Sequence, residues 1–519
     1  MGGQAHRTGR VFQGRNRRRT VPEVGPVIDL YPPQRFRHDP INPRKRDEDR
    51  FDLVTLSLRK FGFLLPLYAR QDGLLLSGHQ RSDAAARLGW SVPVHVVAKD
   101  IRDTAGLNLT FNRATNDFTL KDIRHDQMDA EALRDILEGL PDADDPYPCL
   151  NAQSVTVAPL LATNIDYFNR YACNAARQLS EHGIRMPIII DEDGIVLNGV
   201  GRLQYASERE EKEIAAVIVS RKKGEAIRAV MNGLSMDFRL NDGFKDVLRT
   251  NAFRRARQRR KSLGSGYLFP ISEGGKSRCK DFSIGSNADR LKATFGARVL
   301  DFGCGHGDEA RMLRKIGIGV TTFEPFRSTG GVPSRKRGRY SASGFLRAVQ
   351  DGHQFTSILL SSVLNSVPFD ADRRHILTIC AALCGPETTL FAAARSRHDP
   401  NWVETSQGIG LGKTAARSAR FVLLDEPGMS VSELNANPKV QRYFQPSEFR
   451  DLFEDLFEEV SIGLHINNVT ATCRVPRPLD LDRLRQALQF EFDLPYPEGR
   501  MGFADKALSI FSQRLGVSL

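Results

Sequence analysis

Ala297-Arg-Val-Leu-Asp301-Phe-Gly303-Cys-Gly305-His-Gly307-Asp-Glu309 decides the fold of the C-terminal half of this chain. It reads as an apolar strand ending in an acid, then a turn of alternating glycines and a helix start. Glycine permits backbone angles and a close approach that a Cβ would block, and a helix N-terminus offers amide donors. Glu324 ends the next strand, where a carboxylate can accept both hydroxyls of a ribose. The pattern predicts a nucleoside site at Asp301, Gly303, Gly305, Gly307 and Glu324.

The acid before the first glycine indicates which nucleoside. A carboxylate at Asp301 would repel a pyrophosphate but not the cationic amino-acid end of S-adenosylmethionine. The order Asp-x-Gly-x-Gly-x-Gly, with a following strand that ends in Glu, resembles the first two motifs of class I S-adenosylmethionine-dependent methyltransferases. That resemblance implies S-adenosylmethionine as cofactor. Two alternatives stay open: a nicotinamide or flavin site, since Gly305, Gly307 and Ala310 fit Gly-x-Gly-x-x-Ala, and a turn without any ligand.

The sequence after this motif alternates strands and helices. Residues 355–360 and 389–394 read as buried strands, residues 372–383 as a helix, and residues 457–462 as another strand. Gln445-Pro-Ser-Glu opens a capped helix. The fold class predicted is α/β, with a doubly wound, Rossmann-like methyltransferase sheet over residues 280–476. Apolar spacing in residues 477–519 predicts a helical C-terminal appendage.

The loop after the fourth strand usually shows what is methylated. Enzymes acting on exocyclic amines of bases carry Asp/Asn/Ser-Pro-Pro-Tyr/Phe there, whereas this chain has Ser362-Val-Leu-Asn365-Ser-Val-Pro-Phe369. Cytosine C5 methylation needs a thiolate, and the sole Pro-Cys, at Cys149, lies outside the domain. The sequence therefore favours a small or modified acceptor. Ser361 and Asn365 are the candidate catalytic residues, although capping explains them equally well, and no single histidine stands out as a general base.

The N-terminal half contains an internal duplication. Residues 61–81 align without a gap on residues 182–202, with glycine, proline, Asp-Gly, leucine, glycine and arginine recurring at a constant offset. In each copy a helix ends at glycine, proline opens a strand, and Asp-Gly makes a hairpin turn. A second strand then leads to Gly-x-x-Arg at a helix start. The duplication predicts two small α+β units in tandem.

This repeat resembles the ParB N-terminal/sulfiredoxin-like fold, and the second copy is degenerate. Relatives bind nucleotide phosphates with backbone donors and the arginine fork. The resemblance implies a phosphate site in the first unit, with CTP or ATP and Mg as further cofactors, and a weaker site in the second. The residues it implies are Asn42, Arg44, Gly78, His79, Gln80, Arg81, Gly199 and Arg202. The sulfiredoxin nucleophile is lost, because no cysteine precedes Cys149.

Charge indicates a polyanionic partner. The 519-residue chain has a formal net charge of +12 and a pI near 9.4. Basic residues concentrate in the leader, at residues 335–339, and in a run without acids between the halves. A single basic block is usually a solvated surface segment. Three such blocks in one chain favour nucleic acid, and DNA in particular, as the partner. The residues expected to contact it are Arg254, Arg255, Arg257, Arg259, Arg260 and Lys261.

These observations divide the chain into six segments. They are a basic arm (1–21), ParB-like units at 22–145 and 146–222, a helical basic linker (223–279), the methyltransferase domain (280–476) and the appendage (477–519). Seven scattered cysteines predict reduced thiols and no metal site. No run approaches a membrane span, so a cytoplasmic protein without a membrane partner is expected. A homo-oligomer stays open.

The sequence thus predicts an S-adenosylmethionine-dependent methyltransferase acting on nucleic acid or a modified nucleotide, as in DNA modification by a phage or mobile element. The first rival is a nucleotide-switched, DNA-binding regulator with an inert methyltransferase-like domain. The second is a ParB-like kinase, for which Asp47, Glu48 and Asp49 could supply an acidic base.

Overall fold

The computed structural model describes residues 27–102, 104–118, 129–164, 169–236, 239–252, 287–329, 332–408, 418–424, 426–435, 438–465 and 467–519. The basic leader lies outside these residues. So do Arg254, Arg255, Arg257, Arg259, Arg260 and Lys261, so the nucleic-acid contact expected of them stays a prediction. Among the described residues, no helix combines the length and apolar composition that a bilayer crossing requires.

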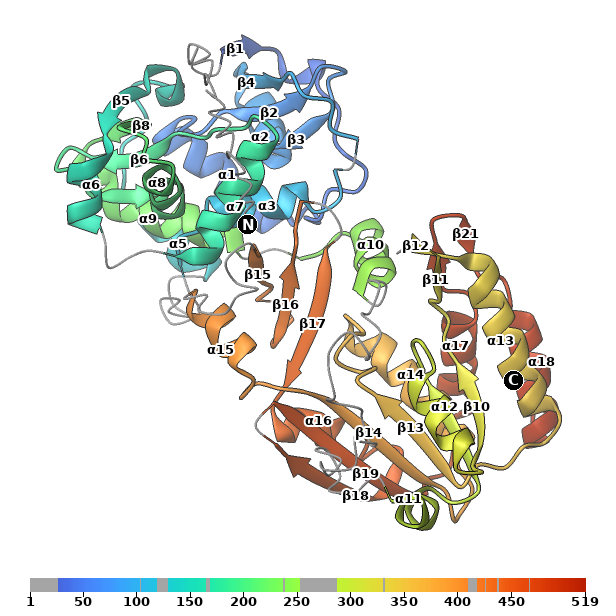
Figure 1. The fold of residues 1–519 in the computed structure, drawn as a ribbon. Helices are drawn as coiled ribbons and strands as arrows, with labels where there is room; N and C mark the ends of the chain where they lie inside the picture. The colour runs from blue at the N-terminus through green and yellow to red at the C-terminus, as the bar shows by residue number, and fades with distance from the viewer. Residues whose placement is uncertain are drawn as a thin grey trace, which may run out of the picture.

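The first repeat is a four-stranded sheet in the order β1-β4-β2-β3 with its helices (Figure 1). Its elements are β1 (Ile28–Tyr31), α1 (Glu48–Phe61), β2 (Leu67–Arg70), β3 (Leu75–Ser77), α2 (His79–Leu88), β4 (Val92–Val97), α3 (Leu107–Ala114) and α5 (Ala130–Glu138), with 3₁₀ turns at Pro33–Arg35 and Pro148–Asn151. Strand β2 runs parallel to β4 and antiparallel to β3.

The second repeat has the same strand arrangement, in the order β5-β8-β6-β7. Its elements are β5 (Gln153–Thr156), α6 (Val157–Asn164), α7 (Arg170–Glu181), β6 (Ile188–Asp191), β7 (Val196–Asn198), α8 (Val200–Glu208), β8 (Glu213–Val219) and α9 (Arg221–Met236). Strand β6 again runs parallel to β8 and antiparallel to β7. The duplicated sequence therefore forms a duplicated structure.

Glycines set the shape of both repeats. Gly78 precedes α2 with a φ of 92°, and Gly199 precedes α8 with a φ of 116°. Side chains with a Cβ rarely adopt this left-handed region. The two glycines thus direct the short second strand of each hairpin into its helix, which leaves the first amides of α2 and α8 pointing out of the sheet edge.

The C-terminal half is built on a parallel sheet. Among the described residues its order is β10-β9-β13-β14, continued on one side by antiparallel β19 and β18 and at the end of β14 by β17, β16 and β15. The strands are β9 (Arg298–Phe302), β10 (Gly319–Phe323), β13 (Ser357–Ser361), β14 (Thr389–Ser396), β15 (Arg420–Val422), β16 (Met429–Ser432), β17 (Lys439–Phe444), β18 (Phe457–Leu464) and β19 (Asn468–Pro476), with short pairs β11 (Ser328–Thr329), β12 (Val332–Pro333), β20 (Pro495–Tyr496) and β21 (Gly499–Arg500).

Helices cover both faces of this sheet, as the alternating pattern predicts. They are α11 (Ala288–Phe295), α12 (Asp308–Lys315), α13 (Arg335–Gln350), α14 (Asp370–Ala382), α15 (Pro400–Gln407), α16 (Pro446–Asp451), α17 (Leu481–Glu491) and α18 (Ala504–Leu515). Residues 477–519, the predicted helical appendage, are largely helical and pack against the rest of this half. Phe492 follows α17 and stacks on Phe345 of α13, 6.0 Å between ring centroids, inside the main core.

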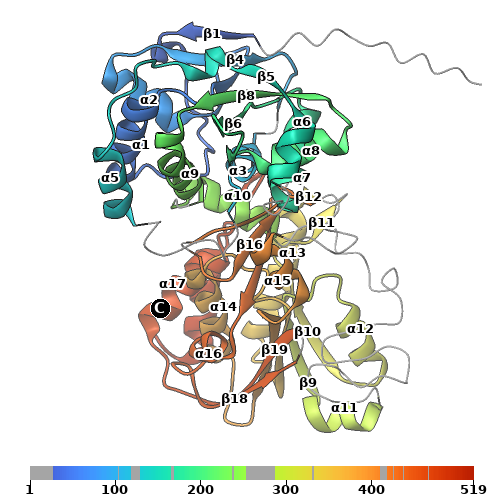
Figure 2. The ribbon, with the colours of Figure 1, turned by 90° about the vertical axis from the view of Figure 1, so that its left-hand side faces the viewer.

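One helix joins the two halves. Helix α10 (Asp242–Ala252) lies between the repeats and the C-terminal sheet, beside β15–β17 (Figures 1 and 2). Its Phe244 and Leu248 are buried in a core cluster shared with Phe111 of the first repeat and Val431 of β16. The halves are therefore connected by packed apolar side chains as well as by the chain itself.

Candidate functional site

The glycine turn has the conformation that its sequence predicts. Gly303, Gly305 and Gly307 have φ values of 78°, 56° and 70°, which favour glycine at each position. A Cβ on Gly303 would lie 2.5 Å from Cγ2 of Val363, the second residue beyond β13. Asp301 precedes the turn and is buried in the end of β9. The turn leads directly into α12.

Glu324 lies at the same edge of the sheet, because β10 pairs with β9 in parallel and Phe323 is opposite Phe302. Its carboxylate accepts from the Gly305 N–H at 2.8 Å and from the Phe326 N–H at 3.0 Å. The Glu324 N–H donates to Ser341 Oγ at 2.9 Å. The predicted second acid is thus in direct contact with the glycine turn.

The charges of Asp301 and Glu324 both act on Cys304, which lies in the glycine turn. Burial raises the pKa of its thiol, and the charges of Asp301 and Glu324 raise it further. The five predicted residues therefore lie together at one edge of the sheet, and of the five Gly303 lines the neighbouring cavity. They also fit S-adenosylmethionine: the turn has no Cβ to block its approach, and two carboxylates can meet an ammonium group and a ribose.

The two predicted catalytic residues are buried. Ser361 Oγ donates to Glu309 Oε1 at 3.4 Å, across the start of α12. The Asn365 carbonyl accepts from the Arg442 N–H at 2.7 Å, which ties the loop after β13 to β17. Both interactions hold the loop in place, and the catalytic role expected of Ser361 and Asn365 stays a prediction beside the capping alternative. A general base is still not assigned.

A cavity of about 30 Å³ lies between the glycine turn and this loop. Gly303, Val363 and Pro368 line it, together with Asp372 at the start of α14 and Arg249 of α10. Sequence reasoning counted Arg249 in the basic run between the halves and gave Asp372 no role, whereas in the structure the two side chains pair with each other. They lie 123 positions apart, and neither belongs to a motif, so only the fold brings them together.

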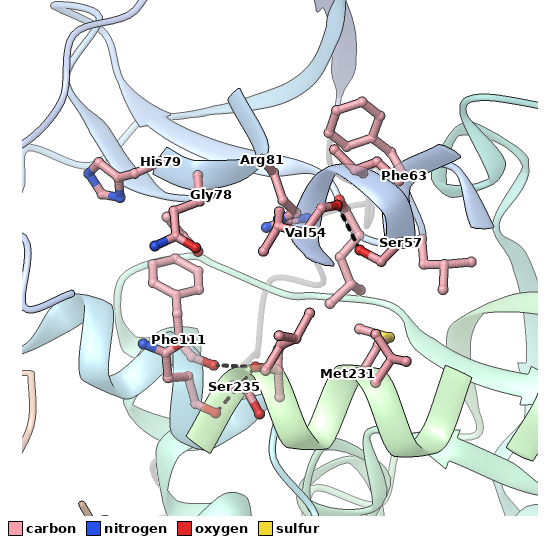
Figure 3. A pocket seen from close by; sticks show the side chains of 18 of the residues that line it. Val54, Ser57, Phe63, Gly78, His79, Arg81, Phe111, Met231 and Ser235 are labelled. Atoms are coloured by element: carbon pink, nitrogen blue, oxygen red, sulfur yellow. Dashed lines mark hydrogen bonds between the residues drawn. The ribbon is translucent and has the colours of Figure 1, made fainter. Parts of the chain in front are cut away.

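A larger cavity of about 180 Å³ lies in the first repeat (Figure 3). All six residues predicted there line it: Asn42, Arg44, Gly78, His79, Gln80 and Arg81. Apolar side chains complete the lining: Val54 of α1 lies beside Arg81, and Met231 of α9 lies on the opposite side of the cavity (Figure 3). Of the described residues that line the cavity, none is an aspartate or a glutamate.

The arginines of this cavity are held by backbone oxygens. Arg81 donates to the carbonyls of Leu65 and Pro66 at 2.5 and 3.4 Å, and Arg44 donates to the Leu234 carbonyl at 2.7 Å. Burial lowers the pKa of Arg44 to about 10, and the like charges of Arg50 and Arg81 lower it further. The cavity wall is therefore strongly electropositive.

In the second repeat the corresponding position already holds a carboxylate. Asp117, from the loop after α3, accepts from the Gly199 N–H at 2.6 Å and from the Gly201 N–H at 3.5 Å. Burial lowers the pKa of Arg202 to about 10, and the charge of Asp117 opposes this decrease. Asp117 thus occupies the place at Gly199 and Arg202 that the sequence predicts for a phosphate.

Comparison with known proteins identifies the C-terminal half. Residues 255–456 match a family model described as "Methyltransferase domain". The ubiquinone biosynthesis O-methyltransferase of Citrobacter koseri is 24% identical over 214 residues, which cover 40% of this chain and 80% of that protein. The protein of the same name from Escherichia fergusonii is also 24% identical, over 40% of this chain and 81% of its own length.

Solved structures give weaker matches. A methyltransferase from Methanosarcina mazei aligns with a TM-score of 0.25 and 16% identity, over 35% of this chain and 93% of that one. An amino pentose methyltransferase from Micromonospora echinaspora aligns with a TM-score of 0.22 and 16% identity, over 36% and 88%. On the family match and the curated relatives, the C-terminal part is a methyltransferase domain and the chain an S-adenosylmethionine-dependent methyltransferase.

Proposed function

We propose that this methyltransferase acts on nucleic acid or on a modified nucleotide, in the DNA modification of a phage or mobile element. The proposed acceptor is a hydroxyl group of a modified base, because the base-amine loop is missing and the curated relatives are named O-methyltransferases. S-adenosylmethionine supplies a methyl group on a sulfonium that leaves as a neutral thioether. The protein contributes binding and orientation: Asp301 and Glu324 hold the donor against the glycine turn.

The first turn of α13 is the main support for a nucleic-acid substrate. It holds Arg335, Lys336 and Arg337 and no acid, although the helix dipole disfavours cations at an N-terminus by about 0.3–1 kcal/mol each. Tyr340, on the same helix, is 79% exposed. Two turns of one helix thus present cations and an aromatic ring, the combination that binds phosphates and stacks on a base.

The buried face of this helix adjoins the donor site, since Ser341 Oγ accepts from the Glu324 N–H. A nucleic acid held by α13 would therefore lie beside the site of methyl transfer. The basic run at residues 254–261 is proposed as a further contact.

Two measurements test this proposal. DNA nucleosides from cells with and without the protein are compared by mass spectrometry, and a mass increase of one methyl group is expected. DNA binding is then measured against salt: Lys336→Ala with Arg337→Ala should lower the slope of log K by about 1.8 if each side chain contacts a phosphate. Arg347→Ala, exposed on the same helix, is the matched control. An unchanged slope would refute the role of α13.

We also propose a second function, the binding of a nucleotide or related anion in the cavity of the first repeat. The lining of the cavity supports it: Arg44, Arg81 and the start of α2, which follows Gly78, meet there. The guanidinium groups of Arg44 and Arg81 both line this cavity, and a guanidinium is the side chain best suited to bind a phosphate or carboxylate.

The apolar lining of the cavity limits which ligands are plausible. Met231, Val54 and Phe111 can contact a base or a similar ring, and Arg44 and the start of α2 can meet a phosphate. CTP or ATP with Mg is the ligand expected from the ParB resemblance. Since the described lining offers no carboxylate to a metal, Mg would be held by phosphates and water.

Isothermal titration of CTP, ATP and inorganic pyrophosphate, with and without Mg, tests the second proposal. Arg44→Gln should weaken binding at least tenfold, since a charge-assisted hydrogen bond contributes about 1.5–3 kcal/mol. Arg87→Gln, an exposed partner of Asp52, should bind as the wild type does. No binding of any of the three probes would argue for a purely structural cavity.

The kinase alternative finds less support. Asp47 accepts from the Arg50 N–H as the N-cap of α1, and Glu48 and Asp49 occupy its first turn. None of the three lines the cavity. Titration with S-adenosylhomocysteine distinguishes the methyltransferase from the other alternative, a nucleotide-switched regulator. A methyltransferase should bind this compound, and its Asp301→Asn variant should bind it more weakly. An inert methyltransferase-like domain should not bind it.

A further inference from the structure

Helix α10 connects the walls of the two cavities. Its N-terminal end is bonded to the loop that carries Arg44: the Asn241 N–H donates to the Pro43 carbonyl at 2.7 Å, and the Lys45 N–H donates to the Arg239 carbonyl at 2.8 Å. Arg44 and Leu240 form an antiparallel bridge between these bonds. The start of α10 is therefore attached to the wall of the first-repeat cavity.

The other end of α10 reaches the methyltransferase cavity. Arg249, about 10 Å along the helix from Asp242 at 1.5 Å per residue, donates to Asp372 through Nε at 2.7 Å and through Nη2 at 3.1 Å. Its guanidinium lies 5.0 Å from the Phe369 ring and 5.2 Å from the Phe490 ring. A bidentate pair between aromatic rings has one geometry, which makes this contact rigid.

The pair is buried and is part of the cavity wall. The side chains of Arg249 and Asp372 are 19% and 6% exposed, and both line the cavity that Gly303 and Val363 complete. Arg249 therefore forms part of the boundary of this small cavity. Access to the space between the glycine turn and Pro368 thus depends on where α10 places Arg249.

We propose that Arg249 is a positioning residue of the methyl-transfer site, and that α10 couples this site to the first-repeat cavity. This inference rests on the proposed functions of both sites. Arg249 fixes Asp372 and the loop before it. Because α10 is bonded at its start to the Arg44 loop, a change at either cavity shifts the helix relative to the other. Such coupling is reciprocal, and values of about 5-fold to 150-fold in affinity are typical.

Hydrogen exchange measured by mass spectrometry, with S-adenosylhomocysteine as the probe, tests the coupling. In the full-length wild type, saturating probe should slow exchange at the glycine turn and also, about fivefold or more, at residues 239–252. Arg249→Gln and Asp372→Asn should keep the effect at the glycine turn and lose it at 239–241. Arg249→Lys, which keeps charge but not the fork, should restore it in part.

Arg374→Gln is the control, because Arg374 pairs with Asp370 on the same helix as Asp372 but does not line the cavity. It should behave as the wild type does. Protection of the glycine turn without any change at 239–252 in the wild type would overturn the inference and leave the methyltransferase function standing.

Absence of probe binding would instead count against the donor site. The coupling through α10 is then tested without ligand, by comparing hydrogen exchange in the wild type with that in Arg249→Gln and Asp372→Asn. Both substitutions should speed exchange in α10 and at residues 41–45 together. Faster exchange in α10 alone would overturn the coupling.

Discussion

Replacing Asp117 tests the comparison between the two repeats most directly. Its carboxylate accepts from the first amides of α8 at 2.6 and 3.5 Å and lies near the buried Arg202. Loss of a capping side chain costs about 1 kcal/mol, and loss of a negative charge at a helix N-terminus costs a similar amount. Asp117→Ala should therefore destabilise α8 by about 2 kcal/mol, which is roughly a 30-fold rise in opening.

Local exchange is the suitable assay, because a chain of several units does not unfold in two states. Amides of residues 200–208 should exchange about 30-fold faster in Asp117→Ala, and only several-fold faster in Asp117→Asn, which keeps an oxygen acceptor but loses the charge.

The decisive measurement adds sulfate. In Asp117→Ala, the place of the lost carboxylate could bind an anion. If its Kd for sulfate is on the order of 10 mM, 0.1 M sulfate should stabilise α8 by about 1.4 kcal/mol, which slows amide exchange about tenfold. Sulfate also stabilises proteins in general, so the wild type in sulfate and both proteins in matched chloride are needed. Asp129→Ala removes the N-cap of α5 and should gain no specific protection. Equal sulfate effects in wild type and Asp117→Ala would refute the reasoning.

Three further predictions concern single sites. Gly303→Ala should abolish binding of S-adenosylhomocysteine in titration, since its φ is 78° and a Cβ would meet Val363 at 2.5 Å; wild-type affinity would contradict this. Burial lowers the pKa of His79 to about 3, below the value near 6.5 of the unfolded chain, so stability is present above pH 6.5 and lost as pH falls toward 3. At pH 5 the loss should be about 2 kcal/mol relative to pH 7, and His79→Gln should flatten this dependence in exchange of α2. The raised pKa of Cys304 predicts slow alkylation by iodoacetamide at pH 8, faster in Glu324→Gln because a negative charge is removed; equal rates would show that Glu324 does not act on the thiol.

The parts of the fold that sequence predicts are those fixed by local backbone constraints. Gly-x-x-Arg after a hairpin and Asp-x-Gly-x-Gly after a strand each specify positive φ values within a few residues. Such constraints do not depend on distant partners. The repeats, the glycine turn and the position of Glu324 at the next strand end could therefore be predicted.

The parts that could not be predicted depend on contacts between distant residues. The pair of Arg249 and Asp372 spans 123 positions, and β15–β17 leave the edge of β14 in a direction that no periodicity encodes. The C-terminal helices have amphipathic spacing, but spacing cannot show that Phe492 stacks in the main core.

One missed signal was present in the sequence. With a one-residue gap the repeat extends past the aligned segment, since Asn112 and Asp117-Phe118 recur as Asn232 and Asp237-Phe238 at an offset of 120 instead of 121. Extending the alignment would have marked Asp117 as part of the repeated unit. Asp237 lies outside the described residues, so the structural comparison holds for Asp117 alone.

The hydrogen bonds of Glu324 link binding of the methyl donor to the conformation of the glycine turn. In the structure its carboxylate already accepts from the Gly305 amide of the turn and from the Phe326 amide after β10, so both donors are satisfied without a ligand. A ribose that engages the same carboxylate would add to these bonds, since a carboxylate has about four acceptor positions, or would replace them. Replacement would leave two amides without partners at about 1–3 kcal/mol each if they stay buried. Binding that keeps both bonds is therefore favoured, and it requires the turn to hold its present conformation. For that reason the substitutions at Gly303 and Glu324 should act on the affinity for the donor before they act on the folding of the sheet.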